Sequence, residues 1–438
     1  MRRVQLWVNP PRVLHCAAMA VMIGSSLTSA ARAQATGASR SGAQTRSDTS
    51  ARRPASSPAT RTAATKPATS AAKTPAKPSA TYWVYVGAES ADLIHRIKFG
   101  PDGAVVERTL GAGELPAENE GPHGLQISAD GKYLHMTTGH GTPDGKYWKY
   151  ELGPDTLVGD PIFLGNFPAS IDVTPDGLYA FAVNFNLHGE MVPSSVSVIY
   201  TPTNTEVARP TTCTMPHGSR ISADGMRQYS TCMMDDQLVE VDTRTFKVAR
   251  RFSLAKGAER GIPPGEYEAM MKEMLPADST GGSPHKHQMP PASCSPTWAQ
   301  PSVTGNKVYV ACNKSDEILE VDAGTWSVSR RFPTGRAPYN LAVTPDGKLL
   351  VATLKAGSGV QVFDLATGKS LMTEKTSITL AHGVTVSSDS RYAFVSVEGK
   401  GAQPGKVEIL DLVALAKVAT VDVGQQASGI TFWKMEKR

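Results

Sequence analysis

The stretch PHGLQISADGKYLHM, residues 122–136, alternates apolar and polar residues on either side of a Ser-Ala-Asp-Gly segment. A two-residue alternation is typical of a half-buried strand, and Asp-Gly is a strong hairpin-turn sequence. The stretch therefore predicts a β-hairpin.

The hairpin pattern recurs five more times, which predicts a repeat architecture. The copies begin 46, 48, 80, 42 and 43 residues apart, so the third interval contains an insertion. The copies are PASIDVTPDGLYAFAV (168–183), PHGSRISADGMRQYS (216–230), PTWAQPSVTGNKVYVA (296–311), PYNLAVTPDGKLLVA (338–352) and AHGVTVSSDSRYAFV (381–395). Two further strand-like runs follow each hairpin, and four-stranded units at this period are typical of a β-propeller.

A seventh unit is split between the two ends of the chain. QQASGITFW (425–433) has the pattern of a lone inner strand, and the N-terminal runs YWVYVG (82–87), LIHRIKF (93–99) and AVVERTLG (104–111) supply the other three. Pairing them would close the ring and remove exposed sheet edges. We therefore expect an all-β, seven-bladed β-propeller with a small helical insertion on one face.

These repeats resemble the YVTN-type seven-bladed propellers of exported bacterial proteins, over essentially all of residues 82–433. The resemblance implies the fold. It says little about activity, because propellers host unrelated functions.

The residues before the repeats have a different composition. Residues 1–33 combine a basic start, an apolar run and Ala31-Arg32-Ala33, which fits a secretory signal peptide. Residues 34–80 are rich in Ala, Ser, Thr, Pro and Lys. Because this segment has too few large apolar residues to form a hydrophobic core, we expect a disordered tether. The propeller then occupies 81–438, and the protein is expected to be periplasmic or secreted.

The charge is divided in the same way. The chain carries +5 in total, and removing the +4 of the leader and the +7 of the tether leaves −6 on the propeller. A mildly acidic domain lacks the basic surface of a nucleic-acid binder. The apolar run of the leader is too short for a confident transmembrane span, and we expect none in the mature chain.

The repeat places residues that are distant in sequence on one face. Inner strands begin, and second strands end, at the top of a propeller, so residues at those positions converge. Three inner strands begin with a histidine, namely His123, His217 and His382, and His140 follows the second strand of the first complete blade. A structural role, bonding a neighbouring blade's carbonyl, and a ligand-binding role are both open for them.

The insertion, about residues 254–293, belongs to the same face and is expected to act as a lid or loop. It contains a helix-forming segment and then SPHKHQM, with His285, His287 and Met289. Imidazole together with thioether or thiolate ligands favours copper. If the ligands are histidine and cysteine only, zinc is the alternative. The arrangement is similar to propellers that hold copper on rings of histidines, although a His-His pair and a cupredoxin domain are absent from this sequence.

Four cysteines remain after the leader and form two nearly equal spacings. Cys213 and Cys232 are 19 apart, and Cys294 and Cys312 are 18 apart. Each pair brackets an inner strand and its hairpin partner, which predicts two disulfides within blades. The alternative is that Cys232 and Cys312 act as soft ligands or redox groups together with His217 and Met233.

Three functions fit these features. The first is an exported binding module whose top face holds a ligand, with copper preferred and zinc as the alternative, at His123, His140, His217, His285, His287 and His382. The second is a lactonase-type hydrolase, because YVGAESADLIHRIKF (85–99) is similar to the opening strand of lactonase propellers. The third is a metal-independent scaffold that binds envelope proteins. We expect a monomer, and no residue is assigned to catalysis.

Overall fold

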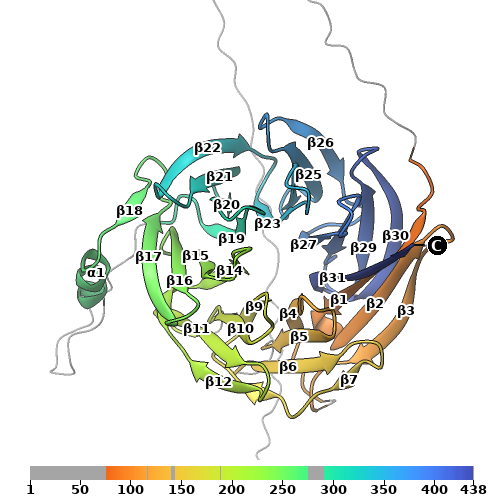
Figure 1. Ribbon diagram of the computed structural model, residues 1–438, viewed down its shortest axis with the longest axis horizontal. Coiled ribbons are helices and arrows are strands. Elements are labelled where there is room, and N and C mark those ends of the chain that lie inside the picture. The colour runs from red at the N-terminus through yellow and green to blue at the C-terminus, as the bar shows by residue number, and fades with distance from the viewer. Residues whose placement is uncertain (1–74, 116, 140–143, 188, 275–290, 438) are drawn as a thin grey trace, which may run out of the picture. The chain divides into compact units, whose positions relative to one another are not determined.

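The computed structural model describes residues 75–115, 117–139, 144–187, 189–274 and 291–437. Within these ranges, seven antiparallel sheets stand as blades around one axis, which confirms the predicted seven-bladed β-propeller (Figure 1). Within the same ranges, no helix combines the length and apolarity needed to cross a bilayer.

Six blades follow one another along the chain, and each begins with its inner strand. Their strands are β4 (Pro122–Ile127), β5 (Tyr133–Thr138), β6 (Lys146–Glu151), β7 (Thr156–Leu157) and β8 (Ile162–Phe163); β9 (Pro168–Val173), β10 (Tyr179–Asn184), β11 (Pro193–Tyr200), β12 (Thr205–Ala208) and β13 (Thr211–Thr214); β14 (Pro216–Ile221), β15 (Arg227–Cys232), β16 (Gln237–Asp242), β17 (Lys247–Ser253) and β18 (Arg260–Ile262); β19 (Pro296–Pro301), β20 (Lys307–Cys312), β21 (Glu317–Asp322) and β22 (Ser327–Pro333); β23 (Pro338–Val343), β24 (Leu349–Leu354), β25 (Gly359–Asp364) and β26 (Ser370–Lys375); β27 (Ala381–Val386), β28 (Tyr392–Val397), β29 (Pro404–Asp411) and β30 (Ala416–Gln425).

The seventh blade joins the two ends of the propeller, as the sequence predicts. Its order is β3 (Gly103–Gly111), β2 (Leu93–Gly100), β1 (Ala80–Ala88) and β31 (Ala427–Lys437), with β31 innermost. Tyr82 and Phe99 of this blade pack against Tyr392 of the preceding one, with ring centroids 5.0 Å from Tyr392 in both cases. Backbone pairing and aromatic packing therefore both close the ring.

The Ser/Thr-x-Asp-Gly element makes the same turn in successive blades. In the first copy the Ser128 hydroxyl donates to Asp130 Oδ1 at 2.7 Å, and the backbone N–H of Tyr133 donates to Ser128 Oγ at 3.0 Å. Gly131 adopts φ of +69°, where a side chain is disfavoured. Thr174 with Asp176, Ser222 with Asp224, and Thr344 with Asp346 repeat the first contact. This explains why the motif recurs without any functional requirement.

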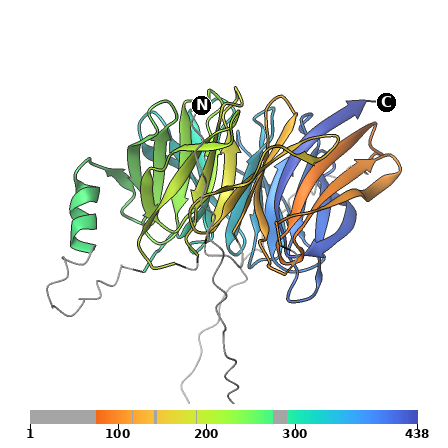
Figure 2. The same ribbon diagram turned by 90° about the horizontal axis from the view of Figure 1, so that it is seen from below.

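The described part of the insertion lies at the outer edge of its blade. β18 adds a fifth strand beside β17, and the helix α1 (Glu266–Met274) stands outside the ring (Figures 1 and 2). The Tyr267 hydroxyl donates to the Thr212 carbonyl at 2.8 Å, and the Arg251 guanidinium lies 3.4 Å from the Tyr267 ring centroid. The rest of the insertion includes residues 275–290, which lie outside the described ranges, so the lid over the top face stays a prediction.

Both predicted disulfides are present. Cys213 bonds to Cys232 and Cys294 bonds to Cys312, with Cα–Cα distances of 5.8 and 4.5 Å. The first is not confined to one blade as we predicted, because Cys213 lies on β13, which pairs with β11 of the preceding blade. It therefore ties two neighbouring blades together, and all four thiols are occupied.

Candidate functional site

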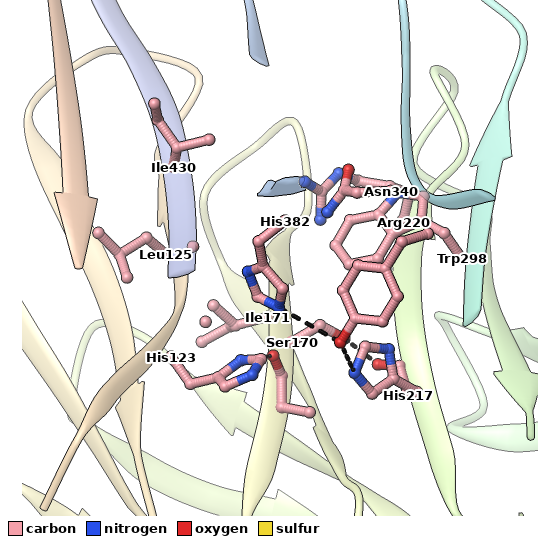
Figure 3. A pocket seen from close by; sticks show the side chains of 14 residues that line it. His123, Leu125, Ser170, Ile171, His217, Arg220, Trp298, Asn340, His382 and Ile430 are labelled. Carbon is pink, nitrogen blue, oxygen red and sulfur yellow. Dashed lines mark hydrogen bonds between the residues drawn. The ribbon is translucent and has the colours of Figure 1, made fainter. Parts of the chain in front are cut away.

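The inner strands enclose a small cavity near the points where they begin. Its volume is about 20 Å³, which is enough for roughly one water molecule or one ion. Histidines from three blades meet there, together with Tyr339, Arg220 and Trp298 (Figure 3). The predicted convergence of His123, His217 and His382 is thus observed. The ring centroid of His123 lies 6.2 Å from that of His217 and 5.3 Å from that of His382.

A ring of hydrogen bonds to backbone carbonyls links every blade to the next around this cavity. The donors and acceptors, in order, are His123 Nδ1 to Ala169 (2.6 Å), Ser170 to His217 (2.5 Å), His217 Nδ1 to Thr297 (2.9 Å), Thr297 to Tyr339 (2.8 Å), Thr353 to His382 (2.7 Å), Ser396 to Ser428, and Ser428 to Pro122 (2.9 Å). The structural role considered for these histidines therefore accounts for one nitrogen of His123 and one of His217.

The other nitrogen of each ring, Nε2, faces further polar groups. A carbonyl only accepts hydrogen bonds, so Nδ1 of His123 must carry the proton, and Nε2 of the neutral ring has a lone pair. This Nε2 lies 3.6 Å from Glu89 Oε1, which is also an acceptor. Two acceptors face each other most favourably when a proton or a metal ion lies between them.

Tyr339 separates the remaining two histidines. Its hydroxyl oxygen lies 2.9 Å from His217 Nε2 and 3.2 Å from His382 Nε2. His217 Nε2 is an acceptor, because Nδ1 donates to Thr297, so the single hydroxyl proton is directed to His217. The backbone of Ser428 lies beside His382, as the backbone of Thr297 lies beside His217. The geometry at His382 Nδ1 does not meet the standard criteria for a hydrogen bond.

Burial keeps these imidazoles neutral. It lowers the pKa of His217 to about 3, assisted by the nearby His123. Burial also lowers the pKa of His382 well below its ordinary value, and the Lys355 charge adds to the effect. Neutral imidazoles are the form that binds metal ions, so His382 needs no deprotonation at neutral pH.

Two carboxylates and one ammonium surround the histidines. Lys355 Nζ lies 2.8 Å from Glu398 Oε1 and 4.1 Å from the centroid of the Tyr339 ring. Burial alone would lower the Lys355 pKa, but Tyr339, Glu398 and Glu89 raise it above its ordinary value. With Glu89 and Glu398 ionised, the group has a formal charge of −1, which favours a cation.

Glu89, His123 and His382 have the spacing of a metal site. One donor atom from each lies within 4.8 Å of the other two, and all three side chains are buried. Glu89 is held by Gln426, whose Nε2 donates to Glu89 Oε2 at 2.9 Å. Glu89 follows β1 and Gln426 precedes β31, so closure of the ring creates this part of the site.

The other residues predicted for the site are distributed differently. His140, His285 and His287, like Met289, lie outside the described ranges. Cys213, Cys232, Cys294 and Cys312 offer no thiolate while they form disulfides. Met233 and Met215 pack against the buried cluster of Phe167, Ala169 and Phe185. The ring centroid of Phe185 lies 4.9 Å from that of His217.

Lys355 was missed, and the roles of Glu89 and Glu398 were not recognised from the sequence. Glu89 and Glu398 are found at the ends of second strands, at the positions expected to face the top, yet their pairing with histidines depends on which blades are neighbours. Lys355 follows β24 at the equivalent position. Its position relative to the repeat was the signal that could have identified it.

Comparison with known proteins supports the fold more than any activity. No family model matches the chain. The uncharacterized protein YncE of Salmonella typhi is 26% identical over 155 residues, and YncE of Salmonella typhimurium strain LT2 has the same identity. These alignments cover 33% of this chain and 43% of each relative.

Hydrazine synthase of Kuenenia stuttgartiensis has a similar structure, with a TM-score of 0.51 at 17% identity. The alignment covers 72% of this chain and 91% of the other, and at this identity it shows the fold alone. The chain is therefore a seven-bladed β-propeller with a distant sequence similarity to YncE.

Proposed function

We propose that this protein is an exported binding module that holds a divalent transition-metal ion at Glu89, His123 and His382. The observation that carries the proposal is the approach of their donor atoms to within 4.8 Å of one another, with all three side chains buried. Ligands of one tetrahedral ion, at about 2.1 Å from it, stand roughly 3.4 Å apart. The 3.6 Å between His123 Nε2 and Glu89 Oε1 needs little adjustment.

The donor set narrows the choice of metal. Copper was preferred on the sequence because cysteine and methionine were candidate ligands, but the disulfides remove thiolates. Two imidazoles and a carboxylate suit zinc and copper(II), and the same set is used for iron(II). Of these ions we propose zinc and copper(II), the two that the sequence also favours, with the fourth position left to water.

The size of the cavity favours binding over hydrolysis. About 20 Å³ accommodates roughly one water molecule or one ion but not a lactone ring. A zinc ion with two histidines and one glutamate could activate water, and that chemistry would need a larger opening than the described cavity offers. We therefore do not propose the lactonase alternative.

Metal retention tests the proposal. Protein exported to the periplasm would be purified without chelator and analysed for zinc, copper and iron, then stripped and titrated with each ion. We expect about one ion per chain in the wild type, and strong loss of binding in His123→Ala, His382→Ala and Glu89→Gln. Glu89→Gln is the most specific variant, because it preserves shape and removes only the charge.

His135→Gln is the matched control. His135 is also buried with a pKa lowered to about 3, but its Nδ1 lies 2.7 Å from the Tyr147 hydroxyl within a blade. It should bind metal like the wild type. A folded wild-type protein without retained or titratable metal would instead favour the scaffold function, which co-purification of envelope proteins by metal-free protein would support.

A further inference from the structure

A second, larger cavity lies at the opposite ends of the inner strands. Its volume is about 210 Å³, and its walls come from the later residues of β4, β14, β19, β23, β27 and β31. More of the lining residues are apolar than polar, but the surface that they present to the cavity is mostly polar, with Gln126, Gln300, Thr385 and Thr431 among the polar residues. Arg220 is the one charged residue among those that line it, and it also lines the small histidine cavity.

The Arg220 guanidinium uses little of its hydrogen-bonding capacity on the residues that the structure describes. Its Nη1 donates to the Ser219 carbonyl at 2.9 Å, and its centre lies 4.5 Å from the Trp298 ring centroid. Among the described residues, no carboxylate forms an ion pair with it. Asp172 acts on it only at longer range, since the Asp172 oxygens accept the backbone N–H groups of Val173 at 2.9 Å and Ile221 at 2.7 Å.

Two further polar groups beside Arg220 are buried and lack a partner within the described part of the chain. Trp298 Nε1 and Asn340 Oδ1 make no hydrogen bond with any residue that the structure describes, and their residues are 6% exposed. Figure 3 shows Arg220, Asn340 and Trp298 together, on the far side of the cavity from His123. An unpaired buried donor costs about 1–3 kcal/mol, which is recovered when a ligand accepts its hydrogen bond. The Asn340 amide can present its N–H₂ group to the same ligand by rotation.

We propose that the channel binds a small oxyanion on Arg220, with the anion entering from the 210 Å³ cavity. The guanidinium fork matches two oxygens of a carboxylate, sulfate or phosphate, and Trp298 stacking fixes its plane. Arg220 and Asp172 together have no net formal charge, so recognition depends on directed N–H groups. This site uses none of Glu89, His123 and His382, and it stands whether or not a metal is bound.

Titration of metal-free, chelator-treated protein tests the site. Acetate, sulfate and phosphate would be added separately, with acetamide as the uncharged control, and followed by calorimetry and tryptophan fluorescence. We expect saturable binding of at least one oxyanion and none of acetamide. Planar acetate and the tetrahedral anions distinguish which oxyanion geometry the channel accepts.

Variants assign the binding to Arg220. Arg220→Gln should abolish it, and Arg220→Lys should weaken it about tenfold, because the ammonium loses the bidentate contact. Arg336→Gln removes an exposed arginine of equal charge and should bind as the wild type does. Trp298→Phe should still bind by calorimetry but lose the fluorescence change, which locates the anion even if Arg220→Gln is unstable.

The proposal is overturned if none of the three anions binds saturably, if acetamide binds equally well, or if Arg220→Lys and Trp298→Phe leave affinity and fluorescence unchanged. Loss of binding in Arg336→Gln would also contradict it, since that would point to surface charge. Metal content measured on the same Arg220 variants separates this result from the proposed metal site, because we expect it to be unchanged.

Discussion

The Tyr339 hydroxyl oxygen lies 2.9 Å from His217 Nε2, inside a cavity that both residues line. The other nitrogen of His217 donates to the Thr297 carbonyl of the next blade, so Tyr339 must be the donor in this pair. The contact therefore fixes the hydroxyl proton on the His217 side, so the hydroxyl oxygen can only accept from His382 Nε2, which lies 3.2 Å away. The proposed metal binding through His382 Nε2 requires the proton of that ring to be on Nδ1, beside the backbone of Ser428.

Replacing Tyr339 by Phe should destabilise the propeller and preserve metal binding. His217 Nε2 would become a buried acceptor without a donor, at a cost of about 1–3 kcal/mol in the free energy of unfolding. Urea unfolding of the metal-free proteins measures this cost. A variant as stable as the wild type would show that the hydrogen bond between Tyr339 and His217 is absent in solution.

The free energy of unfolding should fall as the pH falls below about 6.5. His135 and His217 have pKa values lowered to about 3 by burial, and the pKa of His382 is also lowered, so the unfolded chain binds protons that the folded chain does not. The contribution of each histidine to the free energy of unfolding is fully present above its pKa in the unfolded chain. Below that pKa the contribution declines by up to about 1.4 kcal/mol per pH unit for each histidine. Urea unfolding between pH 7.5 and 4.5 measures the slope, and a His217→Gln variant should show a shallower one. Equal slopes would contradict the assignment.

Removing the first disulfide should cost stability without loss of metal. The Cys213→Ser/Cys232→Ser variant opens a cross-link between residues that are 19 apart in the sequence. Loss of that chain constraint should lower the free energy of unfolding by about 3 kcal/mol. Metal content per folded chain should equal that of the wild type, because neither cysteine is a proposed ligand. A variant that folds but loses its metal would restore the sequence-based alternative of thiolate ligands.

Gln426→Ala should weaken metal binding by about tenfold, the lower end of what loss of a supporting hydrogen bond costs. Gln426 is not a ligand; it orients Glu89 through the 2.9 Å contact to Oε2. Gln425→Ala is the control, because that amide donates to the exposed Ala402 carbonyl at 3.2 Å instead. Equal affinities in both variants, measured by competition with a chelator, would show that Glu89 needs no such support.

The fold follows from the sequence because its signal is repeated. Ser128 with Asp130, and Thr344 with Asp346, make the same turn contact in different blades, so each copy supports the others. The convergence of His123, His217 and His382 could be predicted for the same reason. The repeat assigns each residue to a face.

The chemistry of the site could be predicted only in part, because it depends on contacts between blades. The sequence gives no distance between Glu89 of the closing blade and His123, nor the placement of Tyr339 between His217 and His382. The disulfide of Cys213 shows the same limit, since the partner was correctly predicted but β13 pairs with the preceding blade. Repeat position determines the face, and tertiary packing determines the partners.

The most direct test of the metal site is a crystal structure of protein loaded with zinc, and separately with copper(II), using anomalous scattering at the edge of each metal. We predict one strong peak at about 2.0–2.2 Å from His123 Nε2, His382 Nε2 and Glu89 Oε1. A loaded crystal without a peak between these three residues, or with its peak held by other groups, would contradict the central claim.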